Sequence, residues 1–207
     1  MKKASGERTL LASVLLSAPG PLVVGIGLLL GRSSTQLADF VRRTAELVAI
    51  LVSWLMFRAL SRERPGDGLR KEKFERAASL GVGLAMCLGG AAMALLAFLP
   101  QNWDKGNVVP GLVIAILGVM TNSWFWLRYR KLDRKDPNAI LEVQSRLYRA
   151  KSLVDLCVTA ALLSVALFPG SRGALYMDAG GSLVVSVYLI LSGVGILRGI
   201  ARNSQMA

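Results

Sequence analysis

The chain has 207 residues, of which 53% are hydrophobic, with 25 Lys and Arg against 13 Asp and Glu and no His. Several apolar runs approach the roughly 20 residues that cross a bilayer as a helix, which excludes an ordinary soluble domain. Cys87 and Cys157 both lie inside such runs, so a disulfide framework or a CxxC metal site is excluded and both are expected to be packing residues.

The fold class that this pattern predicts is all-α, a polytopic membrane protein with six transmembrane helices in a single domain over residues 1–207. The predicted helices are at about 9–30, 36–57, 77–99, 109–127, 147–168 and 179–197. The first contains Pro19, Gly20 and Pro21, which we expect to kink a spanning helix. A secretory signal is the alternative there, but the apolar run resumes after Pro21 and is longer than a signal requires.

The second predicted helix carries charges within its first half. Asp39, Arg42 and Glu46 are separated by three and four residues, so they lie on one helix face. Arg43 belongs to the flank of that face, where it could extend outward.

The fifth predicted helix repeats the arrangement of the second. Tyr148, Lys151 and Asp155 have the same three-and-four spacing. A charge at the bilayer centre costs about 2.5–3.5 kcal/mol on insertion scales, so these side chains must face one another or water. Both a closed network that holds the two helices together and a solvated site that binds a substrate satisfy this requirement.

The third and sixth predicted helices are rich in small residues, in "GVGLAMCLGGAAMA" and "LSGVG". Small residues allow helices in a membrane to approach closely. Packing within one subunit and a homodimer interface both remain open.

The basic residues gather in alternate connections. Regions 58–76 and 128–149 hold seven Lys and Arg each, whereas the connections near Lys105 and Arg172 hold one each. This is the positive-inside pattern, and it predicts that both termini are cytoplasmic. The basic regions are expected to contact anionic membrane lipids, with no nucleic-acid partner. We expect a multi-pass protein of the cell membrane.

Four stretches resemble the membrane domain of the cation diffusion facilitators: "SSTQLADFVRRTAELVAILVSWL", "KFERAASLGVGL", "GVMTNSWFWLRYRKLDRKDPNAILEVQSRLYRAKSLVDLCVTAALL" and "MDAGGSLVVSVYLILSGVGILRG". The resemblance covers nearly the whole chain. It implies a six-helix, usually homodimeric exchanger that moves divalent cations such as zinc out of the cytoplasm against protons. The cytoplasmic metal-binding domain that usually follows the sixth helix is expected to be missing.

The resemblance places a transport site on helices 2 and 5, where each helix gives a His or Asp followed four residues later by Asp. Those positions are Arg42 and Glu46 in one helix and Lys151 and Asp155 in the other. Protonated Arg and Lys offer no lone pair to a metal, so we expect no metal site and no cofactor. Asn122 lies where the family often has Asn; it either lines the pathway or bonds across helices.

Two functional hypotheses follow. In the first, the chain is a proton-coupled secondary transporter of an ion or small molecule: Glu46 and Asp155 bind a cation or protons, and Arg42 and Lys151 act as internal counter-charges. An anionic or zwitterionic substrate held by Arg42 and Lys151 is a variant of it. In the second, the chain is a transport-inactive scaffold or accessory subunit. No enzyme is expected, because the sequence lacks HExxH, GxSxG and a phosphate-cradling loop.

Overall fold

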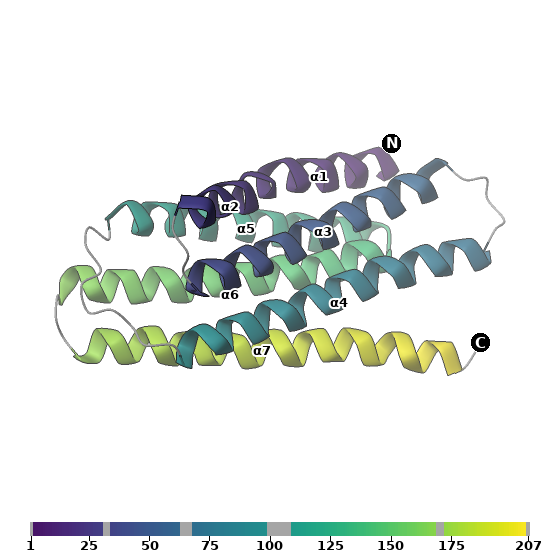
Figure 1. Ribbon diagram of the computed structural model, residues 1–207. Helices are drawn as coiled ribbons and strands as arrows, with labels where there is room; N and C mark the ends of the chain where they lie inside the picture. Colours follow the sequence, from purple (N-terminus) through teal and green to yellow (C-terminus); the bar gives the residue numbers. More distant parts are fainter. Residues whose placement is uncertain (1, 31–33, 63–67, 99–108, 169–171, 206–207) are drawn as a thin grey trace.

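The computed structural model describes residues 2–30, 34–62, 68–98, 109–168 and 172–205, and these residues contain helices and no strand (Figure 1). The all-α class is therefore confirmed. The helices are α1 (Lys2–Ser17), α2 (Pro19–Leu30), α3 (Ser34–Arg62), α4 (Gly68–Phe98), α5 (Val109–Lys135), α6 (Ala139–Leu167) and α7 (Arg172–Gln205).

The first predicted span is divided into α1 and α2 at Ala18, where the sequence predicts a kink. Pro19 and Pro21 have no backbone N–H, so two hydrogen bonds of a continuous helix cannot form across this point. Pro19 is instead the first residue of α2, a position that favours proline because its N–H would have no partner there. The backbone N–H of Ala18 still donates to the carbonyl of Val14, which completes the last turn of α1.

The helices form an elongated bundle. α4 packs most extensively against α7, and α5 packs against α6, while α3 lies beside α4 and carries α1 and α2 on its other side (Figure 1). The start of α1, the end of α3, the start of α4, the turn between α5 and α6, and the end of α7 lie together at one end of the bundle. We call this end, with basic regions 58–76 and 128–149, the basic end.

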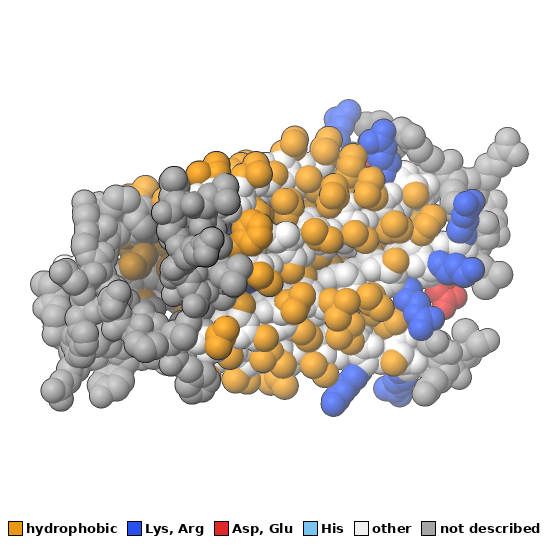
Figure 2. All heavy atoms as spheres, in the orientation of Figure 1, with side chains coloured by type: hydrophobic (Ala, Val, Ile, Leu, Met, Phe, Trp, Pro, Cys, Tyr) orange, Lys and Arg blue, Asp and Glu red, His pale blue; other side chains and the backbone are white. Residues whose placement is uncertain are grey.

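The side chains on the surface divide in the same way. In Figure 2, Lys and Arg gather at the basic end, while hydrophobic side chains cover the middle of the bundle. Large apolar side chains along the helices are exposed, among them Leu15 at 64%, Ile114 at 69% and Val184 at 69%. An exposed apolar surface of this extent is what a protein presents to lipid.

Four segments of the described helices are long and apolar enough to cross a membrane on their own: Phe40–Ser61, Arg70–Leu95, Leu112–Lys135 and Leu183–Arg202. The two other predicted spans correspond to α1 with α2, and to α6. α1 and α2 share one span and have 16 and 12 residues. α6 has 29 residues and carries Lys151 and Asp155 near its midpoint.

The helices continue beyond the predicted spans at the basic end. Residues 58–62, 68–76, 128–135 and 139–149 are helical, and Asp136–Asn138 connect α5 to α6. The apolar run marks the hydrocarbon layer, whereas a helix can continue into water with charged residues on its surface. Three features support the extensions: Lys71 pairs with Glu75 at 3.8 Å, Arg146 pairs with Glu142 at 2.6 Å, and the Asn138 side chain accepts from the Ile140 N–H at 2.9 Å.

The small residues of α4 and α7 account for their close contact. A Cβ atom at Gly193 would lie 2.7 Å from the Gly83 carbonyl oxygen and 2.7 Å from Cys87 Sγ. At Gly90 it would lie 2.9 Å from the Ser186 carbonyl oxygen, and the Ser186 hydroxyl donates to the Gly90 carbonyl at 2.8 Å. These glycines therefore serve packing within one chain, one of the two readings of the small-residue pattern.

We predict that Gly193→Ala destabilises the bundle by about 1–3 kcal/mol, because the added methyl group meets backbone atoms of α4 that cannot move aside. Gly180→Ala in the same helix is the matched control, since a Cβ there would meet nothing within 4 Å. It should leave the free energy of unfolding unchanged or raise it by up to about 1 kcal/mol, because Ala favours a helix over Gly. Thermal unfolding in detergent measures both; equal losses would contradict the close contact.

Candidate functional site

The structure brings a carboxylate of α3 and an ammonium group of α6 together inside the bundle. Glu46 and Lys151 each lie near the midpoint of their helix, and Lys151 Nζ is 3.4 Å from Glu46 Oε2. Their side chains are 10% and 15% exposed. The ion pair therefore joins two helices. The four-residue spacing in the sequence, by contrast, predicts that Lys151 pairs with Asp155 of its own helix.

Asp155 is held from α5. The Asn122 amide donates from Nδ2 to Asp155 Oδ2 at 2.6 Å. Arg42, Glu46 and Lys151 line the same cavity as this carboxylate. The four charged residues that the sequence places on two helix faces thus surround one space, and Asn122 contacts one of them directly.

Two glycines make room for these side chains, and the sequence analysis does not identify either. A Cβ at Gly118 of α5 would lie 2.7 Å from Asp155 Oδ2, and one at Gly89 of α4 would lie 3.3 Å from Arg42 Cγ. Gly89 belongs to the stretch "GVGLAMCLGGAAMA", which the sequence assigns only to helix packing. Any larger residue at Gly118 would displace the Asp155 carboxylate from its position beside Asn122.

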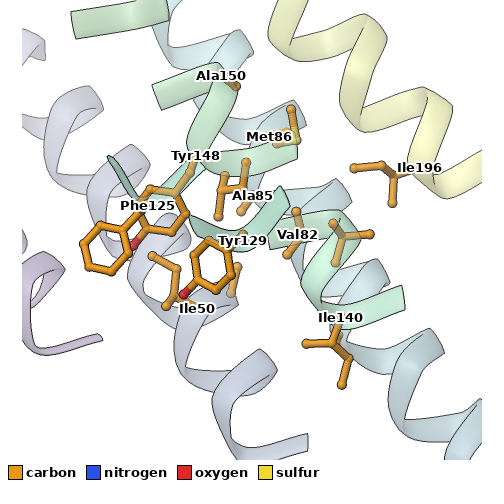
Figure 3. Packing of buried hydrophobic residues seen from close by; sticks show 14 of the residues in the cluster. Ile50, Val82, Ala85, Met86, Phe125, Tyr129, Ile140, Tyr148, Ala150 and Ile196 are labelled. Atoms are coloured by element: carbon orange, nitrogen blue, oxygen red, sulfur yellow. The ribbon is translucent and has the colours of Figure 1, made fainter. Parts of the chain in front are cut away.

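Tyr148 lies on the basic-end side of the ion pair, within an aromatic cluster of Phe125, Tyr129 and Tyr148. Lys151 Nζ is 5.1 Å from the centre of the Tyr148 ring. The three rings lie side by side (Figure 3), with centroids 5.0 Å apart for Phe125–Tyr148 and 5.4 Å apart for Tyr129–Tyr148. Each is at most 1% exposed. The cluster is therefore buried on the basic-end side of the ion pair.

Hydrogen bonds fix this cluster to α1. The Tyr129 hydroxyl donates to Ser13 Oγ at 2.7 Å, and the hydroxyls of Tyr148 and Ser17 are 3.3 Å apart. These contacts satisfy the phenolic hydroxyls where water cannot reach them.

A cavity of about 500 Å³ adjoins the charged residues. Its charged lining comes from five side chains, Arg42, Arg43, Glu46, Lys151 and Asp155, and Asn122 lies among its uncharged polar residues. Apolar walls come from residues of α5 and α6 on the side away from the basic end, namely Ile114, Leu117, Val158 and Leu162. The Glu46–Lys151 ion pair and the Asp155 carboxylate thus face a space large enough for a small molecule.

Arg43 and Asp39 are the two other charged residues of α3 that the sequence places on or beside the polar face. Arg43, expected on the flank, lies against Gly20 of α2, with Nη1 3.4 Å from the Cβ position of that glycine. It also lines the cavity. Asp39 lies in α3, but its side chain is outside the described residues.

The donor set of the site differs from that of a zinc centre. Within the part of the chain that the structure describes, no three His, Cys, Asp or Glu side chains are close enough together to hold a metal ion. Glu46 and Asp155 offer carboxylate oxygens, but the Lys151 ammonium occupies the position beside Glu46. A fixed positive charge there raises the free energy of binding a dication.

Residues 10–202 match the family model of the cation efflux transmembrane domain. The chain belongs to the cation diffusion facilitator family. The match covers nearly the whole chain and confirms the family to which the sequence motifs point. Members of this family are transporters, so this chain is a multi-pass membrane protein built on a cation-transport scaffold. No curated protein matches the chain.

We predict that Glu46→Gln and Lys151→Met each destabilise the fold by about 3–5 kcal/mol, because each leaves the partner charge buried and unpaired. The double variant should lose less than the sum of the two, with a coupling free energy of about 1–3 kcal/mol. The free energies of reversible unfolding in mixed micelles, measured for the wild type, the two single variants and the double variant, give this coupling free energy.

The control is the Glu142–Arg146 pair in the same helix as Lys151, whose side chains are 50% and 53% exposed. The cycle of Glu142→Gln and Arg146→Met should give a coupling below about 0.5 kcal/mol, because water screens an exposed pair. Equal coupling in the two cycles would mean that the Glu46–Lys151 pair is not a buried interaction.

Proposed function

We propose that the chain is a proton-coupled secondary transporter of a cation, in which Glu46 and Asp155 bind the substrate and Lys151 and Arg42 neutralise them when it is absent. The observation that carries the proposal is that the Glu46–Lys151 pair faces a cavity of about 500 Å³. A scaffold requires only a dry, closed network of charges, and it gives no reason to keep such a cavity beside the pair.

Lys151 is the internal substitute for the substrate. At 3.4 Å and an effective dielectric constant of 20, its attraction to Glu46 is about 5 kcal/mol, of which desolvation cancels a large part. A substrate cation that takes its place must offer Glu46 a comparable interaction. The side chain of lysine is long and flexible, so its ammonium can move away within the cavity while the backbone of α6 stays in place.

The cavity favours an organic cation over a bare metal ion. Its volume of about 500 Å³ far exceeds that of a dehydrated ion, and Ile114, Leu117, Val158 and Leu162 provide apolar walls. A ligand with a cationic group and an apolar body uses both features. A dication would also meet Arg42 and Lys151 with no compensating third carboxylate among the described lining residues.

The position of the cavity supports alternating access. It extends along α5 and α6 away from the basic end, and the aromatic cluster separates it from that end. If the basic end is cytoplasmic, as its charge predicts, this conformation has the site closed toward the cytoplasm. Export then requires a second conformation in which Phe125, Tyr129 and Tyr148 separate.

A zwitterionic substrate is the second candidate. Three cations, Arg42, Arg43 and Lys151, line the cavity together with the two carboxylates, so a ligand with both signs of charge could pair with each.

For the assembly we propose a homodimer, supported by Gly195 and Gly199 of α7, where a Cβ would meet nothing within 4 Å in the same chain.

The test is proton flux in proteoliposomes that carry an internal pH-sensitive dye. Gradients of tetraethylammonium, guanidinium, K⁺ and Zn²⁺ probe cations, and glycine betaine probes a zwitterion. We expect an organic cation to drive proton movement in the wild type and Asp155→Asn to reduce it to the rate of protein-free liposomes, because the substrate loses a charged partner.

Glu142→Gln removes a carboxylate from the same helix outside the cavity and should transport at the wild-type rate. Wild-type flux in Asp155→Asn would contradict the assignment of this carboxylate. Proton movement driven by none of the cations but by glycine betaine would select the zwitterion, and no flux with any probe would favour the scaffold.

A further inference from the structure

A second cavity, of about 400 Å³, lies at the basic end of the bundle. Its walls come from α1, α3, α4, α5, α6 and the turn between α5 and α6. None of the described residues lines both this cavity and the one beside Glu46. It is therefore a separate feature, and its volume is within the range of small-molecule sites.

The cavity is lined by four cations and one carboxylate. Arg128, Lys131 and Lys135 lie on one face of α5 because they are three and four residues apart, and Lys71 approaches from α4. Asp136 is the carboxylate. Over the described ranges, no Asp or Glu forms a salt bridge with any of the three cations of α5. Four cations against one carboxylate leave an excess of positive charge in the lining, which attracts an anion.

Two further features reinforce this attraction. Arg128 is held in place, because its Nη2 donates to Ser5 Oγ of α1 at 3.2 Å. Pro137 and Asn138 also line the cavity, immediately before the first residue of α6. The positive end of the dipole of a 29-residue helix therefore adjoins the same space.

The floor of the cavity is apolar. Phe57 of α3 and Leu141 of α6 are 6% and 3% exposed, and Leu60 and Leu132 are partly buried beside them. The combination of a cationic rim and an apolar floor suits a ligand that has an anionic group and an apolar part.

We propose that this cavity binds a phosphate monoester or diester, with the phosphate oxygens on Arg128, Lys131 and Lys135 and the apolar part against Phe57 and Leu141. A phosphate group offers several acceptor oxygens to several donors at once, which suits three cations in a row better than a single carboxylate does. The ligand is a phospholipid headgroup or a soluble phosphate ester, since a cluster of basic residues beside apolar spans attracts anionic headgroups. This site is independent of the proposed transport site.

The test compares two double variants that remove the same charge from α5. Lys131→Gln/Lys135→Gln empties the rim of the cavity, whereas Arg130→Gln/Arg134→Gln removes two neighbouring cations that do not line it. All four side chains are exposed, so neither variant disturbs the core. The probes are dihexanoyl phosphatidic acid and inorganic phosphate, with binding to the purified full-length protein in neutral detergent followed by native mass spectrometry.

We expect the wild type and Arg130→Gln/Arg134→Gln to bind dihexanoyl phosphatidic acid alike, and Lys131→Gln/Lys135→Gln to bind it about 30-fold more weakly. If the same substitutions also abolish binding of inorganic phosphate, the phosphate group alone suffices and a soluble ester fits. If only the lipid binds, the headgroup is the ligand. Equal binding by the two double variants, or no binding of either probe to the wild type, would overturn the proposal.

Discussion

The ion pair between Glu46 of α3 and Lys151 of α6 is the interaction on which the arrangement of the bundle depends. Both charges lie near the midpoints of helices that belong to a membrane domain, at a depth where each alone would cost several kcal/mol. They can remain there only if α3 and α6 hold them face to face. The rotation of these two helices about their axes is thereby fixed, and with it the direction in which Arg42 and Asp155 point.

The rest of the site follows from this constraint. Asp155 is one turn beyond Lys151 on the same face of α6, so it faces α5, where Asn122 donates to it and Gly118 leaves room for it. Tyr148 is one turn on the other side, where it packs with Phe125 and Tyr129. The charges thus meet a cavity in one direction and a buried aromatic cluster in the other. This asymmetry is what a transport site that opens to one side at a time requires.

The sequence predicts some of these features and misses others for physical reasons. The three-and-four spacing of Asp39, Arg42 and Glu46 identifies a charged face, because helix geometry is local. Which helix that face meets is not local, so the contact of Lys151 with Glu46 across two helices depends on the fold. Gly118 has no side chain to signal its role, and only the position of Asp155 shows why a larger residue does not fit.

The helix ends illustrate a second limit. Hydropathy locates the hydrocarbon layer, so it detects the apolar parts of α3 and α6 but not the charged turns that extend them to Arg62 and back to Ala139. Together with the charged ends of α4 and α5, these extensions line the cavity at the basic end, and the sequence analysis treats the cations of that cavity as loop charges. The division of the first span at Ala18, in contrast, is predictable, because prolines remove backbone donors whatever the tertiary context.

The most direct test of the central claim is a solid-state NMR measurement in lipid bilayers. Dipolar dephasing between ¹⁵N-lysine side chains and ¹³C-carboxylates reports the distance across the ion pair. Transfer of magnetisation from water protons to the same groups reports whether the ion pair is in contact with water in the cavity. The account predicts a short-range dephasing component that transfers magnetisation from water and disappears in Lys151→Met. No component that depends on Lys151, or one without any transfer from water, would contradict a charge pair that faces an accessible site.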